Sequence, residues 1–237
     1  MNYPGSKRRL FKHIFPIMEK ELKPGDYVVD LFCGGGNFID KVPTKYKRIA
    51  NDKDDIVLAL QFIRDHVDEL PKNNKEFTKE DYYFWKNYEP QNDYEKAFKA
   101  FVARAYSFGG TKWGSWAHNN AHRDYVEKAY RNAVKQSPLL KGITFYNLSY
   151  EEVPLPEPDK CVIYCDPPYK NVSKYAADID HQKFYDWLRQ KKKEGYRIFI
   201  SEYNMPNDFK CVFEKPIKMT LKRSSNSIER VERLYTL

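Results

Sequence analysis

Two short motifs in the sequence carry residue types that could hold a planar base and a nucleoside. The first is Asp166, Pro167, Pro168 and Tyr169, directly after the apolar run Cys161–Cys165. The run predicts a buried strand, whose end would present a carboxylate, a carbonyl and a flat ring at one sheet edge. The prolines lack backbone N–H donors, so this corner offers hydrogen-bond acceptors. An exocyclic amino group requires acceptors, and the motif therefore predicts chemistry on an amino group.

The second motif is a glycine-rich loop. Val28–Phe32 predicts a short buried strand, and Cys33, Gly34, Gly35, Gly36 and Asn37 follow it. Glycines at the carboxyl end of a strand allow a tight turn and a close approach to a ligand. Ile39 stands where a dinucleotide fingerprint needs another glycine, and no Gly-Lys-Ser/Thr follows, which disfavours NAD and ATP. A second predicted strand, Arg48–Asn51, leads to Asp52, where an acid would accept hydrogen bonds from a ribose diol. The pattern favours a nucleoside cofactor without a polyphosphate.

In this order and spacing the motifs resemble those of Dam-type DNA adenine methyltransferases of the D12 class, alpha group, which use S-adenosylmethionine. The matching segments are YPGSK (3–7), DLFCGGGNF (30–38), NDKD (51–54) and DPPY (166–169), while SEYNMP (201–206) and the ending KRSSNS…ERLYTL resemble the late sheet of the family. They span nearly the whole chain. The resemblance implies an α/β fold, with a Rossmann-like class I methyltransferase sheet, helices on both faces and a helical target-recognition insertion.

The resemblance also implies roles for single residues. Tyr3 and Lys7 resemble the aromatic and lysine that sit over the cofactor, with Lys7 near the cofactor carboxylate or the catalytic acid. Asp52 resembles the ribose-binding acid. Ser149 marks a departure, because many relatives carry an acid near this point that touches the cofactor adenine. The implied catalytic residues are Asp166, Pro167, Pro168 and Tyr169, and the implied cofactor-binding residues are Tyr3, Pro4, Gly5, Ser6, Lys7, Asp30, Phe32, Cys33, Gly34, Gly35, Gly36, Asn37, Asp52, Asn147, Leu148 and Asp166.

A run of helices separates the two halves of the predicted sheet. Helical spacing of apolar residues predicts helices at 54–67, 95–106 and 124–136, and strands resume near Ile143. A helical insertion is the simplest account. We therefore divide the chain into residues 1–53 and 138–237, which form the catalytic domain, and residues 54–137, which form the insertion.

The insertion contains a loop with aromatic and hydrogen-bonding side chains at 107–120. Such a loop could enter a groove, stack on an orphaned base and contact base edges. Trp113 and Trp116 have an equally good alternative as core residues of the insertion. The predicted DNA-binding residues are Lys112, Trp113, Ser115, Trp116, His118, Asn119, Asn120 and Arg123.

Composition agrees with a nucleic-acid partner. The net charge is +8 and the pI about 9.1, which favours a polyanion such as double-stranded DNA. The four cysteines show no Cys-x-x-Cys pairing, and neither a signal peptide nor a membrane-spanning stretch is evident, so a cytoplasmic location is expected. No metal site is expected, because His118 and His122 lack a third ligand nearby. Nothing demands a dimer, and a monomer is expected.

The predicted reaction is direct methyl transfer to the amino nitrogen of a flipped adenine. Asp166 and the Pro167 carbonyl would accept hydrogen bonds from the amino group while Tyr169 stacks on the base. Three alternatives stay open: cytosine-N4 methylation, in which Ser usually replaces Asp166, methylation of adenine in RNA, and a catalytically silent DNA-binding specificity partner. A test of S-adenosylmethionine binding would distinguish the silent protein from the enzymes, because a silent DNA-binding protein need not bind the cofactor.

Overall fold

The fold is built on one mixed β-sheet, described here from a computed structural model that covers residues 1–117, 123–169, 179–220 and 227–237. Within these residues the sheet has seven strands in the order β3-β2-β1-β4-β5-β7-β6. The first five are parallel, whereas β7 runs antiparallel to both β5 and β6. The strands are β1 (Tyr27–Asp30), β2 (Lys47–Asn51), β3 (Ile143–Tyr146), β4 (Cys161–Cys165), β5 (Arg197–Glu202), β6 (Lys210–Thr220) and β7 (Ser227–Thr236).

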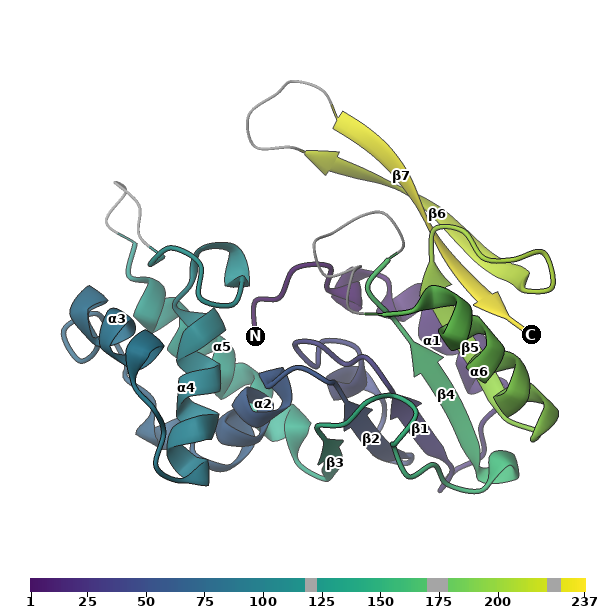
Figure 1. Ribbon diagram of the computed structural model, residues 1–237, viewed down its shortest axis with the longest axis horizontal. Coiled ribbons are helices and arrows are strands. Elements are labelled where there is room, and N and C mark those ends of the chain that lie inside the picture. The colour runs from purple at the N-terminus through teal and green to yellow at the C-terminus, as the bar shows by residue number, and fades with distance from the viewer. Residues whose placement is uncertain (118–122, 170–178, 221–226) are drawn as a thin grey trace.

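Helices cover both faces of this sheet, so the predicted α/β, Rossmann-like class is confirmed (Figure 1). On one face α1 contributes Ile14 and Met18 to a core shared with β1 and β4, and on the other face α6 contributes Phe184 and Leu188 to a second core. The helices are α1 (Phe11–Glu19), α2 (Ile56–Asp65), α3 (Lys79–Asn87), α4 (Asp93–Ala105), α5 (Tyr125–Leu140) and α6 (His181–Lys193).

The helices between β2 and β3 gather beyond the β3 edge of the sheet, while the β6–β7 hairpin extends at the opposite edge (Figure 1). The three helices predicted for this segment are present, with ends shifted by a few residues, and α3 adds a fourth within the described part. Phe101 and Val126 of this group share one apolar core with Val28 and Tyr164 of the sheet. The division at residues 53 and 137 stays a prediction, and α5 continues past the second boundary.

The strand order places the two sequence motifs side by side. β1 and β4 are neighbours in the sheet, with Asp30 in register with Tyr164. From this pair β2 and β3 lie on one side and β5 on the other, so the chain order reverses between β1 and β4. Ligands of open α/β sheets bind at the carboxyl ends of strands at such a switch point. The glycine loop follows β1 and the DPPY motif follows β4, so both stand at this edge.

Candidate active site

The glycine loop after β1 forms a tight turn. Gly34 and Gly36 have φ values of +46° and +69°, a region that side chains other than glycine rarely adopt. The Gly34 N–H donates to Asp52 Oδ2 at 2.9 Å, and the Cys33 N–H donates to the Asn51 carbonyl at 2.8 Å. These bonds join the loop to the end of β2. The predicted ribose acid and the predicted methionine loop therefore lie in direct contact.

Tyr3 lies directly against this loop. A Cβ built on Gly34 would come within 2.5 Å of Tyr3 Cε1, and one on Gly35 within 2.7 Å of Tyr3 Cβ. The approach of the aromatic side chain therefore favours glycine at both positions, and the positive φ of the turn favours it at Gly34 as well. Burial, followed by the charges of Asp52 and Asp54, raises the pKa of Tyr3. Tyr3 is thus packed onto the glycine loop, while its role over a cofactor stays a prediction.

Asp52 is held by two backbone donors. Besides Gly34, the Asp54 N–H donates to its Oδ1 at 3.0 Å. Burial nevertheless raises the pKa of Asp52 to about 6. Asn147 donates to the carbonyls of Asp52 and Asp54 at 2.8 and 3.0 Å, so the turn after β3 braces this acid. The sequence motif placed Asp52 correctly at the end of β2, and the structure adds the backbone that orients it.

Asp30 is a buried acid with an unsatisfied oxygen. Its side chain is 1% exposed, and Oδ1 has no hydrogen-bond partner among the described residues. Burial and the negative charge of Asp166 raise the pKa of Asp30 well above its usual range. A buried carboxylate oxygen without a donor costs free energy unless a ligand supplies one. Its position suits a ligand that brings a cationic or N–H group.

Several other predicted cofactor residues take part in packing or hydrogen bonds within the protein. Phe32 packs against Tyr150 and Phe184, with ring centroids 5.7 and 5.5 Å apart. Leu148 exchanges hydrogen bonds with Asn51, a buried side chain that also donates to the Leu31 carbonyl. Cys33 and Asn37 are buried, whereas Pro4, Gly5 and Ser6 are exposed. The Ser6 hydroxyl caps the short helix that begins at Lys7.

Asp166 meets two further charged residues just beyond β4. Lys7 Nζ lies 3.2 Å from Asp166 Oδ1 and 3.4 Å from Glu232 Oε2. Lys7 and Glu232 are 7% exposed, and the Asp166 side chain is 19% exposed. Burial raises the pKa of Asp166 to about 6, opposed by Lys7 and assisted by Glu232. The DPPY carboxyl is therefore less acidic than an exposed aspartic acid.

Tyr169 completes this cluster. Its hydroxyl donates to Glu232 Oε2 at 2.9 Å, and Lys7 Nζ stands 4.5 Å from the centre of its ring. The Tyr203 ring meets it edge to face at 4.5 Å. Sequence reasoning predicted Asp166, Tyr169 and Lys7 but missed Glu232 and Tyr203. Both missed residues stand in segments that matched the late sheet, yet nothing local in those segments marks a contact with Lys7 or Tyr169.

The loop after α4 is anchored to the helical group. Trp113 and Trp116 are half-buried, and each ring centroid lies 5.5 Å from that of Tyr82. The Tyr82 hydroxyl donates to the Gly114 carbonyl at 2.8 Å. Ser115 and Arg123 are exposed. His118, Asn119 and Asn120 lie outside the described residues.

Lys112 is exposed and pairs with two acidic side chains. Its ammonium lies 2.8 Å from Asp55 Oδ2 and 3.5 Å from Asp54 Oδ2. Arg104, which is 3% exposed, pairs with the same two acids from the end of α4. These ion pairs tie the helical group to the segment that carries Asp52. Sequence reasoning did not find Arg104, because its position in an amphipathic helix shows no sign of its distant partners.

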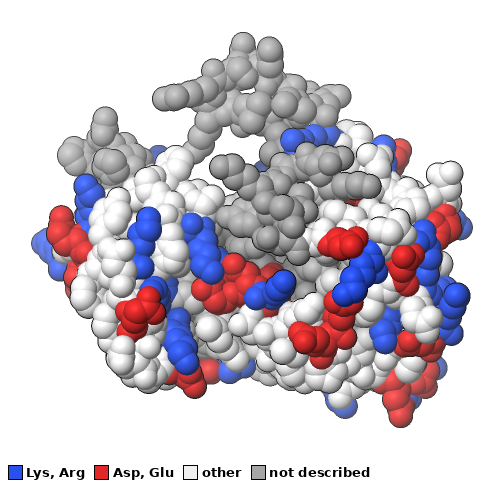
Figure 2. All heavy atoms as spheres, in the orientation of Figure 1, with Lys and Arg blue, Asp and Glu red and all other residues white. Residues whose placement is uncertain are grey.

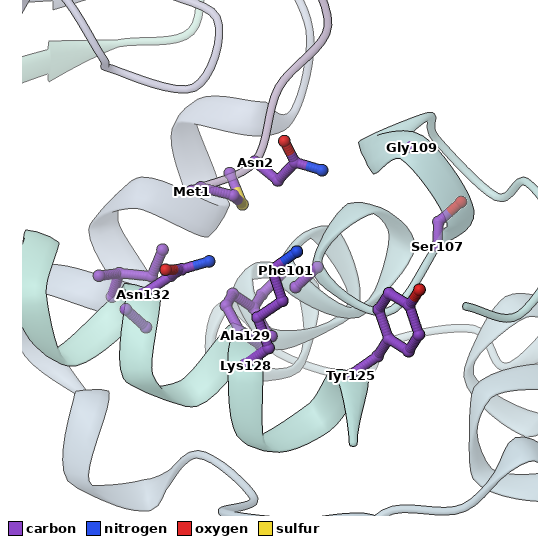
Figure 3. Close-up of a pocket in the computed structure, with 12 residues that line it drawn as sticks. Met1, Asn2, Phe101, Ser107, Gly109, Tyr125, Lys128, Ala129 and Asn132 are labelled. Atoms are coloured by element: carbon purple, nitrogen blue, oxygen red, sulfur yellow. The ribbon is translucent and has the colours of Figure 1, made fainter. Parts of the chain in front are cut away.

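A small cavity and a surface of mixed charge are found in addition to the predicted site residues. A small cavity of about 50 Å³, with room for a few water molecules, lies between Met1, Asn2, Phe101 of α4 and Ala129 of α5 (Figure 3). On the described part of the face in Figure 2, basic and acidic side chains are interspersed. No helix in the described residues is long and apolar enough to cross a membrane, and no group of three or more metal-ligating side chains is found there.

Comparison with solved structures returns distant likenesses. One is precorrin 8W decarboxylase from Methanobacterium thermoautotrophicum (12% identity, 94% of this chain and 89% of that chain, TM-score 0.38). Others are a conserved hypothetical protein of Streptococcus pyogenes (12%, 94% and 92%, TM-score 0.37) and the C-terminal domain of precorrin-6Y C5,15-methyltransferase from Rhodobacter capsulatus (10%, 93% and 85%, TM-score 0.34). Similarities this low carry no argument about function. No curated protein matches the sequence.

The family comparison is specific. A sequence model of the D12 class N6 adenine-specific DNA methyltransferases matches residues 3–237. The match covers both the glycine loop and the DPPY motif, which the strand order brings to one sheet edge. The chain therefore belongs to the D12 class N6 adenine-specific DNA methyltransferases, enzymes that transfer a methyl group to adenine in DNA.

Proposed function

We propose that this enzyme methylates the exocyclic amino nitrogen of an adenine that is flipped out of duplex DNA, with S-adenosylmethionine as the methyl donor. One observation carries the proposal: the acid of DPPY and the glycine loop stand at neighbouring strand ends, β4 and β1. A methyl donor held at one and an amino group held at the other would meet at the switch point.

The residues present fit S-adenosylmethionine. Asp30 offers a buried carboxyl oxygen without a hydrogen-bond partner, and the cationic amino group of the methionine portion would favour its ionised form. Asp52 would accept hydrogen bonds from the ribose hydroxyls, while Gly34 and Gly35 allow a close approach of the backbone. When bound, this cofactor supplies an electrophilic methyl group, which the amino nitrogen takes as the carbon–sulfur bond breaks.

Asp166 and the Pro167 carbonyl would hold the target amino group. As acceptors they draw the nitrogen lone pair out of conjugation with the base and aim it at the methyl group. Because the pKa of Asp166 lies at about 6, its carboxylate is the main form at neutral pH. The nitrogen turns acidic only once it carries the methyl group, so Asp166 need not be a strong base during transfer.

We infer base flipping from the position of Asp166, directly after the buried strand β4. A stacked adenine cannot reach a carboxylate at the end of a buried strand, and extrusion costs a few kcal/mol. Tyr169 would then stack on the extruded base, with its hydroxyl fixed by Glu232. The exposed residues of the loop, Ser115 and Arg123, are candidates for DNA contacts. Lys112 could join them only by exchanging Asp54 and Asp55 for a phosphate.

The decisive experiment identifies the product. The purified protein is incubated with unmethylated plasmid DNA and S-adenosylmethionine, and the nucleosides are separated by mass spectrometry. N6-methyladenine is expected, and sequencing of the product would give the recognition site. Methylcytosine alone would move the assignment to cytosine-N4 transfer.

A second pair of measurements separates the remaining alternatives. RNA is offered as substrate in parallel, and cofactor binding is followed by thermal stabilisation. Methylation of RNA alone would replace DNA as the substrate of this protein. The absence of any product and of stabilisation by S-adenosylmethionine would support a silent DNA-binding protein and contradict the proposal.

A further inference from the structure

Glu232 stands out because it is a buried acid that no sequence motif explained. It lies on β7, which runs antiparallel to β5 near the far edge of the sheet. Only 7% of the residue is exposed, and its Oε2 has two partners, the Lys7 ammonium at 3.4 Å and the Tyr169 hydroxyl at 2.9 Å. A buried carboxylate is costly without such partners.

The three ionisable groups of this cluster do not balance in charge. Lys7 contributes one positive charge, while ionised Asp166 and Glu232 contribute two negative charges within 3.4 Å of it. A purely structural ion pair would match one base with one acid. The surplus negative charge lies next to Asp166, the proposed catalytic acid. In the proposed reaction, the donated methyl group and the nitrogen that receives it carry positive charge there.

We propose that Glu232 is a positioning residue that draws the Lys7 ammonium partly away from Asp166 and anchors the Tyr169 hydroxyl, so that Asp166 keeps an oxygen for the target amino group. This inference rests on the proposed function of the DPPY acid. With Glu232 absent, Lys7 would pair with Asp166 alone and neutralise the acceptor. Tyr169 would at the same time lose the carboxylate that fixes its ring between Lys7 and Tyr203.

Within the described residues, the titratable and charged groups that interact with Asp166 come from several elements. Lys7 precedes α1, Asp30 ends β1, Tyr164 and Cys165 belong to β4, Tyr169 follows β4, and Glu232 lies on β7. Of these, burial raises the pKa of Asp166 most, Lys7 lowers it, and Glu232 raises it. Removing the charge of Glu232 must therefore lower this pKa, both directly and through a closer Lys7.

The test is Glu232→Gln, which keeps the shape of the side chain and an acceptor for Tyr169 but removes the charge. We expect kcat to fall about tenfold, a fraction of the loss for removing a direct transition-state contact, while the KM for S-adenosylmethionine changes by less than about threefold. In the plot of kcat against pH, the fall in activity on the acidic side (the acidic limb) should move to lower pH. Glu232→Asp keeps the charge and should leave the limb where the wild type has it.

Glu214→Gln is the matched control, because it makes the same change in the same hairpin at a side chain that is 65% exposed and pairs with Arg233. It should leave both kcat and the limb unchanged. Wild-type kcat with an unmoved limb in Glu232→Gln would overturn the inference. So would equal losses in Glu232→Gln and Glu232→Asp without a shift of the limb, since that pattern indicates packing.

A measurement without substrate separates this inference from the proposed function. The Asp166 carboxyl is titrated by ¹³C NMR in the wild type and in Glu232→Gln, with thermal unfolding as the check that both are folded. A lower midpoint in the variant is expected whatever the enzyme methylates. An unchanged midpoint would contradict the role of Glu232, whereas failure to methylate adenine would count against the proposed function alone.

Discussion

At the scale of single residues, the acid of DPPY combines a proposed catalytic role with a burial that raises its pKa. Among the described residues, the closest charged partner of Asp166 is Lys7, at 3.2 Å from its Oδ1. Its carboxylate therefore has capacity left for a substrate. Active sites often carry acids whose pKa is shifted by burial and a specific charged partner, as this one is.

Replacing this acid should abolish catalysis without unfolding the protein. In Asp166→Ala, Lys7 still has Glu232 as a buried partner, so the fold is expected to persist. We expect kcat to fall by about a hundredfold to a thousandfold or more, the loss typical of a missing electrostatic contact in the transition state. DNA affinity, measured by fluorescence anisotropy, should change little. Asp159→Ala, at an acid that is 74% exposed, is the matched control, and retained turnover in Asp166→Ala would overturn its assignment.

The pH dependence of kcat should report the same carboxylate. Burial raises the pKa of Asp166 to about 6, and only the ionised form accepts hydrogen bonds through both oxygens. Activity should therefore be lost as the pH falls through about 6 and reach its plateau above it. Because the pKa of Asp52 is also raised to about 6, kcat must be measured at saturating cofactor.

Asp52→Asn provides the control for this profile. It should weaken cofactor binding but retain the acidic limb of kcat, since Asp166 is intact. A kcat that is flat across this range in the wild type would show that Asp166 does not control the step. Loss of the acidic limb in Asp52→Asn would assign it to Asp52 instead.

At the scale of elements, ion pairs connect the helical group to the predicted cofactor site. Arg104 at the end of α4 binds Asp54 and Asp55, and the Asp54 N–H orients Asp52. This buried arginine fixes the end of α4 relative to the segment that carries Asp54 and Asp55. The elements predicted to recognise DNA and to bind the cofactor are therefore mechanically joined.

Removing this connection should affect both stability and cofactor binding. We expect Arg104→Met to lower the free energy of unfolding by about 2 kcal/mol, because two partly exposed acids lose their buried partner but stay accessible to water. S-adenosylmethionine affinity should also fall, since the turn that carries Asp52 loses a support. Urea unfolding and isothermal titration calorimetry measure the two effects. Arg131→Met, at an arginine that is 63% exposed, should show neither, and unchanged affinity in Arg104→Met would refute the coupling.

Sequence patterns predicted those elements that leave a local signal in the sequence, such as a short apolar run or a group of glycines. The runs at β1, β2 and β4 were found because buried parallel strands read as short apolar stretches, and the glycines after β1 mark a tight turn. Glu232 could not be found this way. Its partners Lys7 and Tyr169 come from distant segments, and contacts between distant segments leave no periodic trace in one sequence.

At the scale of the whole molecule, net charge and local charge have different roles. The chain carries +8 overall, yet the described part of the face in Figure 2 shows both signs interspersed. Long-range attraction depends on the total, whereas specific contacts depend on a few side chains. Much of the affinity for DNA should accordingly come from phosphate neutralisation that is independent of sequence.

Salt should therefore weaken DNA binding steeply. Each phosphate neutralised by a lysine or arginine contributes about 0.9 to the slope of log Kobs against log salt for duplex DNA. Fluorescence anisotropy with a duplex of unrelated sequence should give a linear plot with a negative slope. S-adenosylmethionine binding in the same buffers is the control and should change much less, because it does not involve neutralisation of DNA phosphates. A flat plot for DNA would mean that the surplus of positive charge does not face the duplex, and recognition would then have to depend on base contacts from the insertion.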